Sequence, residues 1–85
     1  MENILKHWGE QGKLVIEACN NANAKPMSNN EFLDHCIACG GNWCAMLLSG
    51  IKALYPEVYD AIPNEMGSKA FFCLVEVLEL LNIKE

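Results

Sequence analysis

Apolar residues recur three or four positions apart through most of this chain, and that spacing predicts helices. In the first stretch the apolar positions are Ile4, Leu5, Trp8, Val15, Ala18, Cys19 and Ala22. Gly9 and Gly12 interrupt the pattern, and each glycine costs a helix interior about 1 kcal/mol relative to alanine. We therefore predict a short helix over residues 2–8 and a firmer one over about 11–22, joined through a bend.

The second helix has the clearest start signal in the sequence. Ser28 and Glu31 are spaced as a capping box, in which each side chain accepts a hydrogen bond from the backbone amide of the other residue. Its expected buried face consists of Phe32, Leu33, Cys36 and Ile37. Gly40-Gly41 should end it, because glycine takes the left-handed C′ conformation without a Cβ clash.

A third helix is predicted to begin at Asn42, a good N-cap residue, and to end near Tyr55 because Pro56 follows. Trp43 is expected to be a buried plug at its base, and Ala45, Ser49 and Gly50 are small enough to let another helix approach. Residues 56–62 form a short helical segment with proline at its first position.

The last predicted helix runs from Ser68 to about Asn82 and is apolar nearly all round, which requires burial on most sides. Its valines would also suit a strand, but the sequence offers no second strand to pair with. The sequence therefore predicts an all-α fold: residues 1–85 form a small single domain, a cluster of four to five short helices packed orthogonally or as a bundle.

Composition limits the partners of such a domain. Hydrophobic residues make up 52% of the 85 residues, which indicates either a generous core or surplus apolar surface for a partner. The net charge is −5, and all six basic residues are lysine. An acidic chain without arginine is poorly equipped for nucleic acid, so no nucleic-acid partner is expected.

The sequence also bears on location. No run of about 20 apolar residues is present, so we expect no membrane partner. The first ten residues lack the apolar region of a signal peptide. We expect a cytoplasmic protein whose five cysteines, an odd number, remain reduced thiols.

Residues 34–44, DHCIACGGNWC, contain most of the candidate chemistry. Cys36-x-x-Cys39 followed by two glycines resembles half of a zinc knuckle. A zinc site would need Cys36, Cys39 and Cys44 with a fourth ligand from His35, Cys19 or Cys73. No second CxxC follows, and His35 should point about 100° away from Cys36 on a helix.

The same cysteines allow two further interpretations. Cys36 and Cys39 would lie in the last helical turn, where the dipole favours the neutral thiol, whereas Cys44 would lie in a first turn and be the thiol to test for reactivity if exposed. A Cys44–His pair with His7 or His35 is a weaker alternative. The interpretation we favour is that all five cysteines are small core hydrophobes.

We therefore expect no catalytic activity, no catalytic, cofactor-binding or metal-binding residues and no cofactor. The leading hypothesis is an acidic interaction module that binds a protein partner or a second copy of itself, with the last helix and Tyr55–Tyr59 as contact surfaces. The alternative is the small zinc-binding domain. The carboxylate pairs Glu57/Asp60 and Glu76/Glu79 are expected to be solvated.

Overall fold

The computed structural model describes residues 2–22, 27–65 and 67–84. Within these ranges the chain forms five helices and two short strands. They are α1 (Glu2–Asn21), β1 (Met27–Ser28), α2 (Asn29–Leu33), α3 (Trp43–Leu54), α4 (Pro56–Ala61), α5 (Ser68–Leu80) and β2 (Ile83–Lys84). The predicted all-α fold is confirmed, and the radius of gyration of 11.6 Å matches the value of about 12 Å expected for a compact chain of this length.

The two glycines of α1 divide it as the sequence predicts. Gly9 has a φ of 57°, so the first two turns meet the rest of the helix at a kink. Gly12 lies directly against the backbone carbonyl of Ile4, where a Cβ atom would clash. Gly9 therefore supplies the left-handed conformation of the kink, and Gly12 lets the two halves of α1 pack closely against each other.

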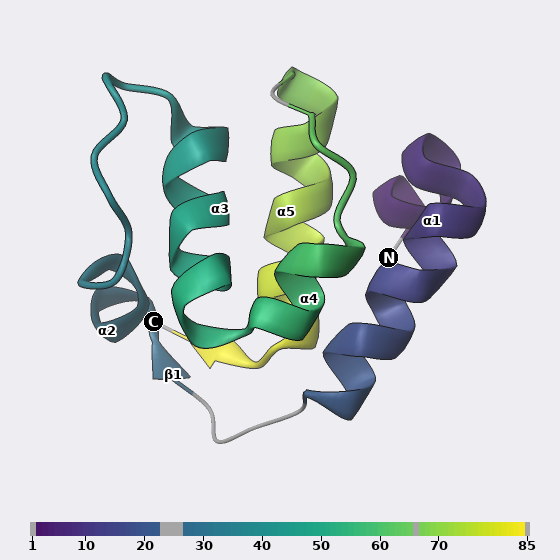
Figure 1. The fold of residues 1–85 in the computed structure, drawn as a ribbon, viewed down its shortest axis with the longest axis horizontal. Helices are drawn as coiled ribbons and strands as arrows, with labels where there is room; N and C mark the ends of the chain where they lie inside the picture. Colours follow the sequence, from purple (N-terminus) through teal and green to yellow (C-terminus); the bar gives the residue numbers. More distant parts are fainter. Residues whose placement is uncertain (1, 23–26, 66, 85) are drawn as a thin grey trace.

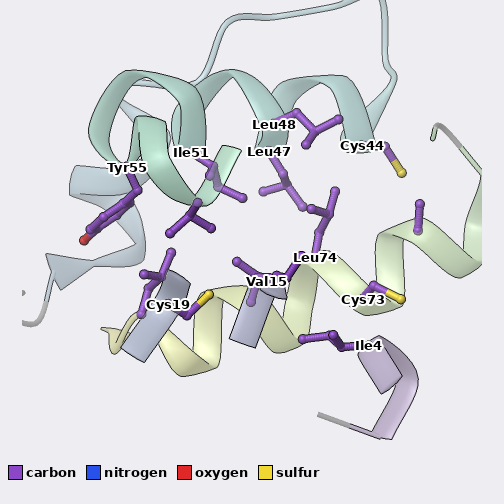
Figure 2. Packing of buried hydrophobic residues seen from close by; sticks show 14 of the residues in the cluster. Ile4, Val15, Cys19, Cys44, Leu47, Leu48, Ile51, Tyr55, Cys73 and Leu74 are labelled. Atoms are coloured by element: carbon purple, nitrogen blue, oxygen red, sulfur yellow. The ribbon is translucent and has the colours of Figure 1, made fainter. Parts of the chain in front are cut away.

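The core lies mainly between α1, α3 and α5, and α2 and α4 add the buried side chains of Phe32 and Val58. α3 and α5 lie side by side, α1 packs against α5, and α4 crosses near the lower end of α3 (Figure 1). Figure 2 shows Leu47 and Ile51 of α3 pointing toward Val15 of α1 and Leu74 of α5. All four side chains are buried, and no buried polar side chain accompanies them among the described residues.

A small parallel pairing fixes α2 beside the end of α5. Met27 pairs with Ile83 and Ser28 with Lys84, so β1 and β2 join the start of α2 to the residues that follow α5. Asn82 makes this possible because its φ of 63° turns the chain out of the helix, a conformation that asparagine tolerates. Strands of two residues each leave no periodic pattern in the sequence and were not predicted.

Most of the predicted helix caps are confirmed. The Glu31 amide donates to Ser28 Oγ at 3.1 Å and the Ser28 amide to Glu31 Oε2 at 3.0 Å, which completes the capping box. Asn42 Oδ1 accepts the amide of Ala45 at 3.2 Å. The last helix begins differently: Gly67 occupies the N-cap and Ser68 is the first helical residue, so the predicted serine cap is wrong by one position.

The second helix is much shorter than predicted. It ends at Leu33. The amides of His35 and Cys36 then bond to carbonyls three residues earlier, instead of four, so the chain leaves the α-helix through a tighter turn. Cys36 then packs against Gly50 of α3, where its sulfur would lie 2.7 Å from an added Cβ. A tertiary contact therefore overrides the helical spacing of residues 32–37.

Gly40 and Gly41 form a turn rather than a helix end. Both have positive φ, at 60° and 83°, and the Asn42 amide bonds to the Cys39 carbonyl at 3.1 Å. Positive φ at both central residues is the backbone of a type I′ turn, for which Gly-Gly is well suited. The segment 34–42 consequently runs as an irregular arch from α2 to the start of α3 (Figure 1).

Several side chains predicted to be buried are exposed. Ile37 is 66% exposed, Trp43 59% and Leu33 40%. Leu33 is the last residue of α2 and Ile37 lies beyond it, so the longer buried helix face predicted for them does not form. Conversely, Tyr55 was expected on a contact surface but is buried in the core. No helix in the described part of the chain is both long and apolar enough to cross a membrane.

Candidate functional site

The five thiols lie at separate places in the fold. Cys19 and Cys73 are fully buried, and burial raises the pKa of each thiol to about 11, with the charges of nearby carboxylates adding to the effect at Cys73. The sulfurs of Cys19, Cys44 and Cys73 lie well apart in Figure 2. Buried thiols of this kind serve packing and are unreactive at neutral pH.

The remaining cysteines each donate to a different carbonyl. Cys44 lies in the first turn of α3 as predicted, but it is only 6% exposed and its thiol donates to the Gly67 carbonyl at 3.4 Å. Cys36 donates to Phe32 at 3.5 Å, and burial raises its pKa. Cys39 donates to Ile37 at 3.2 Å. The expectation that Cys44 is the thiol to test depended on exposure, which it lacks.

The geometry gives the zinc hypothesis no ligand set. In residues 2–22, 27–65 and 67–84, no three side chains of histidine, cysteine, aspartate or glutamate converge closely enough to hold a metal ion. Cys36 and Cys39 lie in the irregular arch rather than in a helical turn, and Cys44 faces Gly67 instead. His35 is exposed on the surface.

Two glutamates anchor the N-terminal half of α1, a role that the sequence analysis did not anticipate. Glu76 Oε2 accepts the Asn3 amide at 3.0 Å and Oε1 accepts the Ile4 amide at 3.1 Å. Burial acts to raise the pKa of this carboxyl, but the hydrogen bonds it accepts at the start of α1 outweigh burial and lower the pKa to about 2. Glu76 therefore caps α1 from α5 while it remains partly exposed, and it is this capping role that the sequence did not predict.

Glu65 fixes the turn of α1 that precedes the kink. Its Oε2 lies 2.9 Å from His7 Nε2 and accepts the Trp8 indole N–H at 2.7 Å. One carboxylate thus satisfies the polar edge of a buried tryptophan and a neighbouring histidine. These contacts join residues nearly sixty positions apart, which is why local sequence patterns gave no sign of them.

The strongest candidate for a functional site is an apolar groove between α2, α3 and α5. We call it the α2/α3/α5 groove and define it by its lining residues Asn29, Phe32, Leu33, Trp43, Leu47, Phe71, Val75 and Leu78. Its volume is about 200 Å³, and seven of the eight lining residues are apolar. Exposed apolar surface costs about 25 cal/mol per Å², so a groove of this composition favours a covering partner.

Each wall of the groove follows from local structure. On α5, Phe71, Val75 and Leu78 are spaced four and three residues apart and therefore share one face. On α3, Trp43 and Leu47 are one turn apart and face the same side. The pairing of β1 with β2 sets α2 at the far end, where Leu33 completes the wall.

A further exposed aromatic residue, Phe72, follows Phe71 on α5 and lines a separate cavity with Lys6 and Lys69. Phe72 is 56% exposed and touches Phe71 edge to face, with ring centroids 5.9 Å apart. Glu79 follows Leu78 on the exposed side of α5, and Asp34 follows Leu33 at the end of α2; both are exposed. No described lysine side chain lines the groove.

A larger cavity on the other side of α3 is a weaker candidate. It has a volume of about 600 Å³ and lies between α3, α4 and Ile37 of the arch. Its polar groups are already engaged: Ser49 Oγ donates to the Ala45 carbonyl at 2.9 Å, and Lys52 Nζ lies 5.3 Å from the centre of the Tyr59 ring. It presents no acid–base pair to a ligand.

The residues of the groove could be recognised as apolar in the sequence, but no opening was expected there because the second helix was predicted to be buried. Phe71, Val75 and Leu78 belong to the helix recognised as apolar nearly all round, and Trp43 and Leu33 were singled out as large apolar residues. The missed step was that α2 stops at Leu33 and leaves this surface open.

Comparison with known proteins provides no further assignment. No protein-family model, no curated protein and no solved structure matches the chain.

Proposed function

We propose that this protein is a cytoplasmic, non-catalytic interaction module that binds a protein partner through the α2/α3/α5 groove. The observation that supports it most is that two large apolar side chains that remain exposed, Leu33 and Trp43, line the same groove. Monomeric proteins expose single apolar residues commonly, but clustered ones mark interaction sites.

The composition of the groove suits protein binding better than small-molecule chemistry. Tryptophan and phenylalanine are enriched at the centres of protein interfaces, where they bury much area with little loss of conformational entropy. The only polar residue of the lining is Asn29, whereas small-molecule sites fix their ligand with several convergent polar groups. The five unpaired cysteines suit a reducing compartment.

The test uses two matched leucines. Leu33 lines the groove and is 40% exposed, whereas Leu14 lies on α1 and is 54% exposed. A panel of amphipathic helical peptides is titrated against the protein, with the emission of Trp43 as the signal because burial of an indole shifts its emission to the blue. Leu33→Gln should weaken any binding at least tenfold, about 1.4 kcal/mol, and Leu14→Gln should leave it unchanged.

Two results would argue against the proposal. Peptide binding that is insensitive to Leu33→Gln would place the interaction elsewhere on the molecule. A protein that binds no peptide of the panel, and that light scattering shows to be monomeric at high micromolar concentration, would leave the groove without an occupant.

A further inference from the structure

A further cavity lies between the first two turns of α1 and the first turns of α5. We call it the α1/α5 cavity and define it by its lining residues Asn3, Lys6, His7, Lys69 and Phe72. The lining residues of each helix are three or four positions apart, so each helix contributes one face. The volume of about 340 Å³ falls within the range of roughly 300–1,000 Å³ that is usual for small-molecule sites, whereas the α2/α3/α5 groove is smaller.

The lining of the α1/α5 cavity is basic, unlike that of the groove. Two lysines and a histidine supply its ionisable groups, and no carboxylate of the described residues lines it. Positive charge therefore gathers at one place in a chain whose net charge is −5. A few convergent polar groups are what orients a ligand in a small-molecule site, and here these groups attract an anion.

The two lysines of the cavity have no partner in the fold. No hydrogen bond, ion pair or ring contact engages the ammonium group of Lys6 or Lys69 in the part of the chain that the structure describes. By contrast, Lys13 bonds to Glu10 at 3.1 Å, and Lys52 lies over an aromatic ring. The ammonium groups of Lys6 and Lys69 consequently remain available to an anion from outside the protein.

Two carboxylates bond to lining residues without lining the cavity themselves. Glu76 Oε2 accepts a hydrogen bond from Asn3 Nδ2 at 2.6 Å, and Glu65 Oε2 lies 2.9 Å from His7 Nε2. The lysines are thus the cationic groups of the lining that no carboxylate neutralises. Two single positive charges match a phosphate monoester, which carries about −1.5 to −2 at pH 7, better than a carboxylate, which carries one negative charge.

Phe72 gives the cavity an aromatic wall. Its side chain is 56% exposed, and it contacts the Phe71 ring at a centroid distance of 5.9 Å. Neither lysine of the cavity lies over the Phe72 ring within the described residues. An aromatic ring that is left in water favours contact with a second ring, which buries apolar area on both.

From these observations we propose that the α1/α5 cavity binds a small aromatic phosphate monoester, with the phosphate group between Lys6 and Lys69 and the aromatic ring against Phe72. Lysine binds phosphate as a point charge, so this site does not need the planar guanidinium fork of arginine, which the chain lacks. The cavity is separate from the α2/α3/α5 groove, and the inference does not rest on the function proposed above.

The experiment titrates small probes into the isotope-labelled protein at pH 7 and low ionic strength. The backbone amide chemical shifts of Lys6, Lys69 and Phe72 report binding. The probes are phenyl phosphate, inorganic phosphate, benzoate and benzyl alcohol. We expect phenyl phosphate to bind at least tenfold more tightly than each of the others, because it alone combines a ring with nearly two negative charges, and added salt should weaken its binding.

Matched variants locate the site. Lys6→Gln with Lys69→Gln should weaken the binding of phenyl phosphate at least tenfold. The control, Lys13→Gln with Lys52→Gln, changes the net charge equally and should leave the affinity unchanged. Phe72→Leu should lower the affinity for phenyl phosphate toward that for inorganic phosphate. All five side chains are exposed, so the variants should retain the fold, which circular dichroism checks.

Several results would overturn the proposal. Phenyl phosphate that causes no shifts at the lining residues has no site in this cavity. Equal affinity for inorganic phosphate would remove the role of the ring, and equal affinity for benzoate would remove the preference for two charges. An equal loss in the Lys13/Lys52 control would show an effect of net charge alone. Leu33→Gln should leave phenyl phosphate binding unchanged, so the failure of this site and the failure of the groove are distinguishable.

Discussion

The two sides of α5 differ in how completely they are covered. On one side Ala70, Cys73 and Val77 are buried in the core with α1 and α3. On the other side Phe71, Val75 and Leu78 reach only the short α2 and the start of α3, and a groove remains. An apolar helix surface is therefore not sufficient evidence of burial, because burial also depends on the length of the neighbouring elements.

The two sides also differ in how polar contacts are used. Where α1 meets α5, Glu76 accepts the amides of Asn3 and Ile4, so the helix start is satisfied by a side chain from another element. Glu79 of α5 and Asp34, which follows α2, are exposed instead. The first arrangement stabilises the fold, and the second leaves both carboxylates in solvent.

The largest expected difference between the two sides comes from removing a leucine. Leu74→Ala on the covered side should reduce the free energy of unfolding by about 3 kcal/mol, because it leaves a cavity in the core. Leu33→Ala at the groove should cost less than about 1 kcal/mol, because much of that side chain is already in water. Urea denaturation of both variants measures the difference, and equal losses would show that the groove is part of the core.

A smaller difference is expected for two glycines that make close contacts. Gly12→Ala should cost about 2 kcal/mol, because the new methyl group meets the rigid backbone of Ile4. Gly50→Ala should cost about 1 kcal/mol, because the methyl group meets the Cys36 sulfur and the Phe32 ring, which can shift. The comparison is again made by urea denaturation, and a greater loss for Gly50→Ala would indicate that the α2 side is the more rigid one.

The next prediction concerns the carboxylate that caps α1. Glu76→Gln should destabilise the fold by about 1 kcal/mol at pH 7, whereas Glu79→Gln should have little effect. The pKa of Glu76 is lower in the folded state than its ordinary value of 4.5, so its contribution is complete above about pH 4.5. It is lost as the pH falls toward 2, because the folded-state carboxylate is then protonated.

Denaturation of the wild type and both variants at pH 7 and pH 2.5 tests this dependence. The wild type and Glu76→Gln should approach the same stability at the lower pH. A gap that stays constant between the two pH values would mean that the charge of Glu76 does not contribute.

The smallest effect is expected from metal removal. Because no metal-binding group is present in the described residues, dialysis against EDTA should leave the thermal midpoint unchanged. Cys39→Ser, in the irregular arch, should likewise leave the thermal midpoint unchanged. Zinc at one equivalent in the purified protein, or unfolding when a chelator is added, would support the zinc-binding alternative.

Much of the fold was accessible from local sequence. The capping box at Ser28, the Asn42 cap, the break at Gly9 and the proline that starts α4 are each decided by neighbouring residues, and each prediction is confirmed. The end of α2 could not be predicted from local sequence, because it depends on the contact of Cys36 with Gly50 in another helix.

The candidate site was accessible only in part. Surplus apolar residues indicated a contact surface, and the last helix was expected to carry it. Its place was obscured because Leu33 and Trp43 were both predicted to be buried. The roles of Glu65 and Glu76 were also missed, since both depend on partners far away in the sequence.

The parallel pairing of β1 with β2 has a consequence for how the molecule forms. It joins segments separated by almost the whole length of α2 to α5, and such distant contacts require closure of a long loop before they contribute any stability. We expect the local helices to form first and the β1–β2 pairing to form late in folding. A nascent chain that still lacks residues 83–84 would accordingly have no β1–β2 pairing to hold α2 beside the end of α5.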